Sequence, residues 1–245
     1  MTQALVRPVL YSFRRCPFAM RARLAIDIAG VQCELREVVL ADKPAAMIAA
    51  SPKGTVPVLI DPQAGVIDQS LAIMRHVLAR SGCAPYLPHA DPGHVTHGWV
   101  QTCDGEFKHH LDRYKYASRY RVGHKADHGA VHAPTVAQDP LSNSPQHDDQ
   151  MRALVHRAQA ADFVSLLDRH LRVHAHLAGA RQGWADLAIA PFLRQFRLAG
   201  AQWFDTQDWP GVQAWLHAFT SDERFMRIMQ KFPPWQEDAP IMLFP

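Results

Sequence analysis

The sequence predicts a chain in two parts: an α/β unit with the element order β-α-β-α-β-β-α, followed by an all-helical unit. In the first eighty residues, short apolar runs of strand length alternate with apolar residues at helical spacing. After a proline-rich stretch, apolar residues recur only at helical spacing, over long segments. We therefore expect an α/β domain over 1–81, a linker over 82–92 and a helical domain over 93–245.

The first elements form a β-α-β unit. A strand is expected over 8–13, where an apolar run ends at two arginines. Pro17 suits the first turn of a helix, and the helical spacing of apolar residues continues until Gly30, a typical stop. Alternation of apolar and charged residues over 31–40 predicts the second strand.

The rest of the α/β unit also alternates between predicted helices and strands. Residues 44–50 predict a short helix, and the apolar run 56–60 predicts a strand. Pro57 interrupts that run, which favours either a cis peptide bond or the start of the strand. After a turn, a short strand is expected at 66–67 and a helix over 70–80.

The second part predicts helices and no strands. Its longest loop is expected over 123–149, where proline and glycine are frequent. Helices are expected over 94–120, 151–177, 186–198 and 210–232.

Composition limits the possible functions. The 245 residues are 48% hydrophobic, 20% charged and 9% aromatic, which excludes a disordered or collagen-like chain. A net charge of +3 is too small to indicate a nucleic-acid-binding surface, although the positive excess lies in the first eighty residues. Since no apolar run is long enough to cross a membrane and no signal peptide is evident, we expect a cytoplasmic protein.

One cysteine stands out as a candidate nucleophile. Cys16 falls at the predicted start of the first helix, beside two arginines, where the helix dipole and positive charge favour a thiolate of lowered pKa. The hydroxyls of Tyr11 and Ser12 are weaker rivals. Because four cysteines in a chain of this length do not suggest a disulfide framework, we expect free thiols, with the others small buried residues: Cys33, Cys83 and Cys103.

Three segments resemble the glutathione-site motifs of cytosolic glutathione transferases, in the same order and spacing. They are 10–19 with its Cys-Pro-Phe-Ala sequence, 53–59 with Val56-Pro57, and 69–73. The first is similar to the omega class, whose active-site residue is a cysteine. The resemblance implies a thioredoxin-like first domain, a helical second domain, glutathione as co-substrate and a homodimer.

The resemblance also implies roles for single residues. Cys16 would form a mixed disulfide with glutathione, and Phe18 would flank the glutathione sulfur. Val56, before a cis Pro57, would offer its backbone N–H and C=O to the cysteinyl unit. Because Ala19 stands where a second cysteine would be needed, a monothiol route through glutathione is expected.

The two ends of glutathione have their own matched positions. Gln69 and Ser70 would hold the γ-glutamyl carboxylate at a helix N-terminus, while a simple N-cap is the alternative for Ser70. The omega pattern usually has Glu at the position of Gln69, so a carboxylate partner for the ligand's ammonium is missing. Lys43 matches the lysine that neutralises the glycyl carboxylate, with an ordinary surface lysine as the alternative.

The helical part carries weaker signals. Gly183 and Asp186 resemble half of the family's capping box, a folding feature. Several aromatics could line a second-substrate pocket, although most are expected in the core: Phe107, Tyr114, Tyr116, Trp184 and Phe192. Two sets of histidines lack a complete zinc motif, so no metal is expected; they are His124, His128 and His132, and His170, His174 and His176.

The sequence therefore predicts a glutathione-dependent thioltransferase or reductase that acts on a glutathione mixed disulfide or on an oxidised substrate such as dehydroascorbate. An apolar or disulfide co-substrate is expected in the cleft between the domains, and no nucleic-acid or membrane partner is expected. Two alternatives remain open. One is conjugation of glutathione to electrophiles, and the other is a non-catalytic transferase-like module that binds ligands or proteins.

Overall fold

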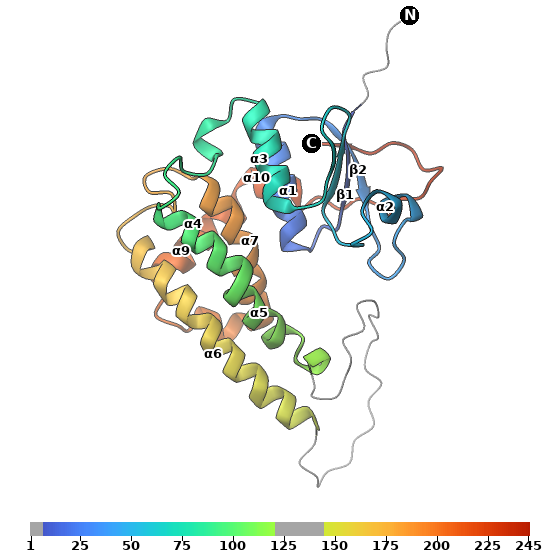
Figure 1. The fold of residues 1–245 in the computed structure, drawn as a ribbon. Helices are drawn as coiled ribbons and strands as arrows, with labels where there is room; N and C mark the ends of the chain where they lie inside the picture. Colours follow the sequence, from blue (N-terminus) through green and yellow to red (C-terminus); the bar gives the residue numbers. More distant parts are fainter. Residues whose placement is uncertain (1–6, 121–144) are drawn as a thin grey trace, which may run out of the picture.

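The computed structural model describes residues 7–120 and 145–245 (Figure 1), and within them a five-stranded sheet has the order β4-β3-β1-β2-β5. β1 pairs in parallel with β2 and antiparallel with β3, as the β-α-β start requires. The predicted order β-α-β-α-β-β-α is confirmed. The strands are β1 (Val9–Ser12), β2 (Cys33–Glu37), β3 (Val58–Asp61), β4 (Gly65–Ile67) and β5 (Leu243–Phe244).

Alternation along the strands divides the core of the sheet between two faces. Leu10 and Leu59 belong to the large core that includes α1 (Pro17–Ala29) and α3 (Ser70–Arg80). Their neighbours Tyr11 and Val58 point to the other face, into a smaller core with Met47 of α2 (Ala45–Ala50). The period-2 pattern of the sequence thus sets which helix covers which face.

One strand was not expected. Phe244 pairs with Cys33 and Leu243 with Glu34, so the C-terminal residues form β5 along the free edge of β2. The expectation of no strand after the linker is therefore wrong. A two-residue strand is too short for a period-2 signal, and its partner lies about two hundred positions away. Covering this edge removes a row of unpaired backbone groups.

In the helical part, α6 packs along α5 and α9, and α7 is the most buried helix (Figure 1). Within the described ranges, no helix combines the length and hydropathy needed to cross a membrane. The helices are α4 (Val95–Thr102), a π-helical turn (Cys103–Phe107), α5 (Lys108–Lys115), α6 (Pro145–Leu171), α7 (Trp184–Ala199), α8 (Ala201–Asp205), α9 (Pro210–Ser221) and α10 (Glu223–Ile228), with short 3₁₀ turns at Ala84–Tyr86 and Ala117–Tyr120.

Several helices differ from the expected ones. The expected helix over 94–120 is divided into α4, the π-helical turn, α5 and a 3₁₀ turn. The expected helix over 210–232 is split at Asp222, whose carboxylate accepts the backbone N–H of Arg224 and starts α10. The expected loop over 123–149 lies mostly outside the described residues, but its last part already belongs to α6, which ends at Leu171.

Asp186 anchors the start of α7 and is fully buried. Its carboxylate accepts the backbone N–H of Gly183, as the half capping box predicts, and also the indole N–H of Trp215 at 2.8 Å. A Cβ at position 183 would lie 2.7 Å from the Cβ of Ala178 and 3.3 Å from the carbonyl oxygen of Pro85. This close approach explains why the N-cap position holds glycine and not the serine or threonine of a complete capping box.

Candidate active site

Cys16 lies where the sequence places it, at the junction of β1 and α1. It is the N-cap of α1, with Pro17 in the first helical position, and it is partly exposed. Its Sγ lies 3.8 Å from the carbonyl oxygen of Val56, within reach of an S–H···O contact. The Val56-Pro57 peptide bond is cis, as predicted. The structure thus brings the first two motifs into contact.

The expectation of a lowered thiol pKa at Cys16 is wrong for the ligand-free protein. Burial raises the pKa of this thiol, because a thiolate is poorly solvated there. The backbone N–H groups of Ala19 and Phe18 and the charges of Lys108 and Arg21 lower it, but they do not offset burial. The helix terminus and its cations are present as expected, so the error lay in neglecting desolvation.

The other thiols and the rival hydroxyls are less suited to catalysis. Burial raises the pKa of Cys33 and of Cys103 to about 12, and both side chains are inaccessible. Cys83 is only half-buried, so the expectation of a buried residue is wrong there, and its S–H faces carbonyl oxygens at 3.6 and 3.7 Å. Tyr11 and Ser12 are fully buried, and their hydroxyls accept hydrogen bonds from arginines at 2.6 and 2.8 Å. Cys16 and Cys83 are therefore the thiols with solvent access.

Ser70 and Gln69 open α3, but not in the roles of an ordinary cap. Gln69 is the exposed N-cap, its side chain makes no capping hydrogen bond, and Ser70 is the first helical residue. The alternative of Ser70 as a simple N-cap is therefore wrong. Its buried hydroxyl accepts a hydrogen bond from Arg21 at 3.4 Å. The first turn of α3 thus keeps N–H groups that can bind an anion.

Arg21 is a central residue of the site that sequence reasoning missed. Its fully buried guanidinium forms a bidentate pair with Asp104 at 2.5 and 3.0 Å and donates to the carbonyl oxygen of Ala188 at 2.7 Å. It also bonds Ser70, so one side chain ties α1 to α3, the π-helical turn and α7. Arg21 and Arg23 interrupt the apolar residues in the first half of α1, and that interruption was the available signal.

Phe18 lies in α1, whereas Lys43 lies in the loop before α2. The Phe18 ring packs edge-on against Phe192 at 4.8 Å, and the Lys108 ammonium lies 5.6 Å from its centre. Lys43 is half-buried, and its Nζ would lie 3.7 Å from a Cβ at Gly54, in the loop before the cis bond. Among the described residues Lys43 has no ion-pair partner, so its charge is available to an anionic ligand.

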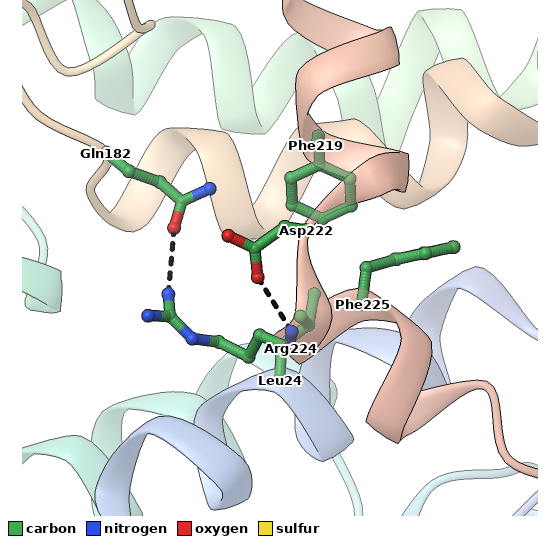
Figure 2. A pocket seen from close by; sticks show the side chains of 6 residues that line it. All are labelled: Leu24, Gln182, Phe219, Asp222, Arg224 and Phe225. Carbon is green, nitrogen blue, oxygen red and sulfur yellow. Dashed lines mark hydrogen bonds between the residues drawn. The ribbon is translucent and has the colours of Figure 1, made fainter.

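The aromatics considered for a second-substrate pocket are mostly core residues. Phe107, Trp184 and Phe192 are buried, whereas Tyr114 and Tyr116 are partly exposed. A cavity of about 10 Å³, the room of one water molecule, lies between α1 and the α9–α10 corner and is lined by none of the predicted site residues. Figure 2 shows the side chains that line it. A larger cavity of about 280 Å³ lies between the π-helical turn and α6.

Comparison with known proteins agrees with this architecture. The family model "Glutathione S-transferase, N-terminal domain" matches residues 10–85, and the model "Glutathione S-transferase, C-terminal domain" matches residues 57–218. A glutathione transferase family member from Pseudomonas fluorescens pf-5, solved with two glutathione bound, has 17% identity and a TM-score of 0.70, covering 93% of this chain and 95% of that chain.

Two further solved structures are similar at comparable levels. The Tau class enzyme from mango has 20% identity and a TM-score of 0.68, covering 93% of this chain and 94% of that chain. The theta class enzyme from Xanthomonas axonopodis pv. citri has 20% identity and a TM-score of 0.66, covering 92% and 98%. Such identities show a shared fold. Because the C-terminal family model spans well over half of the sequence, the chain belongs to the glutathione S-transferase family.

Proposed function

We propose that this transferase is a cysteine-type, omega-like thioltransferase that uses Cys16 as its nucleophile and glutathione as its co-substrate. The observation that carries the proposal is the position of Cys16: a partly exposed thiol at the N-terminus of α1, 3.8 Å from the carbonyl oxygen that precedes the cis Pro57. The relative from Pseudomonas fluorescens was solved with two glutathione bound, which supports glutathione as the ligand.

Glutathione would lie along three features of this site. Its cysteinyl backbone would pair with Val56, its γ-glutamyl carboxylate would meet the first turn of α3 at Ser70, and its glycyl carboxylate would face Lys43. Gln69 would offer an amide to the γ-glutamyl ammonium. Phe18 would flank the sulfur on the side of the helical domain.

The chemistry consists of two thiol–disulfide exchanges. The Cys16 thiol loses its proton to water, and the thiolate attacks the glutathionyl sulfur of a mixed disulfide, so that the substrate leaves as a thiolate and takes up a proton. The thiolate of a second glutathione then attacks the Cys16–glutathione disulfide. Oxidised glutathione leaves, Cys16 is regenerated, and the second glutathione supplies the electrons.

Conjugation of glutathione to electrophiles is the second candidate, favoured by one observation. Because burial raises the pKa of Cys16, this residue is a neutral thiol near pH 7 and can donate its S–H to a glutathione thiolate. The nearby charges of Lys108 and Arg21 would also stabilise that thiolate. In this case the bound glutathione, and not Cys16, is the nucleophile.

Substitution of Cys16 separates the two functions. We expect Cys16→Ser to abolish reduction of a glutathione mixed disulfide, while Cys83→Ser, the matched control at the other accessible thiol, keeps full activity. Conjugation to an aromatic electrophile is measured in parallel. If Cys16→Ser keeps its reductase activity, the proposal is wrong; if only conjugation is lost, the second candidate replaces it.

The wider organisation follows the same proposal. We place the glutathione-binding domain at 1–81, the linker at 82–92 and the helical domain at 93–245, with β5 returning from the helical domain to the sheet. A homodimer is proposed by resemblance, and sedimentation equilibrium of the full chain tests it. A single species at twice the 27.5 kDa chain mass supports the dimer, and one at the chain mass rejects it.

A further inference from the structure

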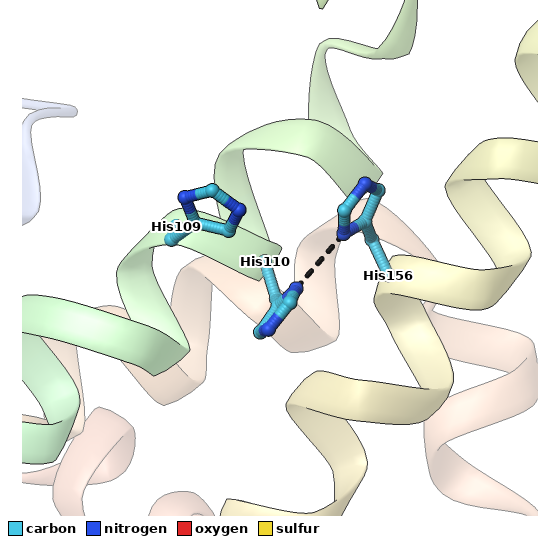
Figure 3. A group of neighbouring side chains, drawn as sticks. All are labelled: His109, His110 and His156. Carbon is cyan, nitrogen blue, oxygen red and sulfur yellow. Dashed lines mark hydrogen bonds between the residues drawn. The ribbon is translucent and has the colours of Figure 1, made fainter.

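Three histidines that no motif singles out meet on the helical domain (Figure 3). His109 and His110 lie on α5, and His156 lies on α6. The Nδ1 atoms of His110 and His156 are 2.8 Å apart, and one candidate ligand atom from each residue lies within 4.8 Å of the others. Among the residues that the structure describes, this is the group of three such side chains close enough to share a metal ion.

We propose that His109, His110 and His156 form a binding site for a divalent transition metal, with Zn²⁺ as the ion that fits best, joining α5 to α6. Three imidazoles and a water molecule are a common tetrahedral zinc ligand set, with an open position for solvent. Soft thiolate ligands are absent from this group, which favours ions that accept nitrogen.

The distances are close to those that zinc needs. Zinc–nitrogen bonds of about 2.0–2.1 Å place tetrahedral ligand atoms about 3.3 Å apart. The facing nitrogens of His110 and His156 therefore need to separate by a fraction of an ångström. For this contact to be a hydrogen bond, one of the two Nδ1 atoms donates its proton to the other. On metal binding the donor ring moves this proton, through water, from Nδ1 to its own Nε2, and both Nδ1 lone pairs are then free to bind the ion. No thiol or carboxylate has to be deprotonated.

The third imidazole is held away by an arginine. Arg113 donates to Nδ1 of His109 at 3.0 Å, and its charge opposes a cation in this place. His109 is exposed, whereas His110 and His156 are half-buried, so His109 is the ligand free to rotate inward once Arg113 releases it. Arg113 therefore sets the affinity.

The site differs from the histidines considered in the sequence. His170 and His174 are stacked with ring centres 4.1 Å apart, but they do not form a group of three ligands within the described part of the chain. His124, His128 and His132 lie outside the described residues. His110 and His156 are separated by 46 positions, and His109 and His110 are adjacent, so no spacing rule would have found them.

Calorimetric titration of the tag-free protein with Zn²⁺ tests the proposal. We expect one site per chain, weakened about 100-fold or more by His110→Ala or His156→Ala and left unchanged by the control His174→Ala. Binding should persist in Cys16→Ser, which excludes the thiol as the ligand. Co²⁺ in place of Zn²⁺ should give the visible absorption of a tetrahedral nitrogen-ligated ion in the wild type and not in His156→Ala.

A variant with the opposite expected effect keeps the test independent of folding defects. Arg113→Gln removes the charge that opposes the ion and the donor that holds His109, so we expect tighter Zn²⁺ binding, by about tenfold. Zn²⁺ should also raise the melting temperature of the wild type more than that of His156→Ala. Equal Zn²⁺ affinity in wild type, His110→Ala and His156→Ala would overturn the proposal, as would an unchanged affinity in Arg113→Gln.

Discussion

In the sheet domain, the residues of the candidate site belong to short segments that each have a recognisable local pattern. The helical domain contributes only single charged side chains, which no local pattern marks. Cys16, Val56 and Ser70 each come from a short segment with its own local pattern. Lys108 and Asp104 come from helices whose patterns say only that one face is buried. The difference teaches that backbone features of a site can be predicted from sequence, and that its electrostatics depend on contacts between distant segments.

The two domains meet at α1, whose buried arginines face opposite ways. Arg21 reaches the helical domain through Asp104 and Ala188. Arg23 donates to Ser12 at 2.8 Å and to the carbonyl oxygen of Ile228 at 3.0 Å, and it pairs with Glu37. Burial lowers the pKa of Arg23. Cys16 begins this same helix, so the domain contacts and the proposed nucleophile share one element.

The largest loss of stability is expected at the capping box of α7, the local motif of the helical domain. Asp186→Ala removes the buried acceptor of the Gly183 N–H and of the Trp215 indole, together with two further backbone N–H groups. Unsatisfied buried donors cost about 1–3 kcal/mol each, so we expect a loss of at least about 4 kcal/mol in the free energy of unfolding, measured by urea denaturation. Asp208→Ala, at a surface carboxylate, is the control. A loss below about 1 kcal/mol for Asp186→Ala would contradict this reasoning.

The next effect tests the contact between the domains. Asp104→Ala leaves the fully buried Arg21 without its counter-charge, and we expect a loss of about 3 kcal/mol in unfolding free energy, because breaking a buried pair is costly. Asp205→Ala breaks an exposed pair with Arg197 and should cost less than about 1 kcal/mol. Because Arg21 also holds Ser70, the KM for glutathione should rise only in Asp104→Ala. Equal losses of unfolding free energy in the two variants would show that the buried pair between the domains matters no more than the exposed one.

A smaller effect, on the KM for glutathione, tests the part of the site at the N-terminus of α3. Gln69→Glu places a carboxylate at the exposed N-cap of α3, where the helix dipole favours it and where it can pair with the γ-glutamyl ammonium. We expect the KM for glutathione to fall by roughly threefold, with kcat unchanged, because a partly exposed ion pair contributes less than about 1 kcal/mol. Gln101→Glu on α4 is the control. A raised KM would show that the γ-glutamyl end lies elsewhere.

The smallest effect concerns the thiol itself. Since burial raises the pKa of Cys16, its thiolate fraction should still be increasing above the pH at which an ordinary thiol is fully ionised. Lys108 lowers this pKa, so Lys108→Gln should move the pH profile of iodoacetamide alkylation to higher pH, whereas Lys115→Gln on the same helix should not. A shift to lower pH would reverse the assigned role of Lys108.

The sequence predicted the fold class and the position of Cys16, because turn residues, strand alternation and helix starts are local signals, whereas the choice of a cis bond at Pro57 came from the resemblance to a known family. It missed β5, whose pairing with β2 depends on residues far apart in the chain. It also erred on the pKa of Cys16, since a dipole and nearby cations can be read from sequence, while burial by other segments cannot. The histidine group on α5 and α6 was missed for the same reason.

The central claim is that Cys16 is the thiol through which this protein exchanges disulfides with glutathione. Mass spectrometry of the intact protein after incubation with oxidised glutathione tests it most directly, with Cys16→Ser and Cys83→Ser in parallel and peptide mapping of the adduct. We predict one glutathione per chain, on Cys16, present in Cys83→Ser and absent in Cys16→Ser. An adduct that persists in Cys16→Ser, or that maps to Cys83, would contradict the account.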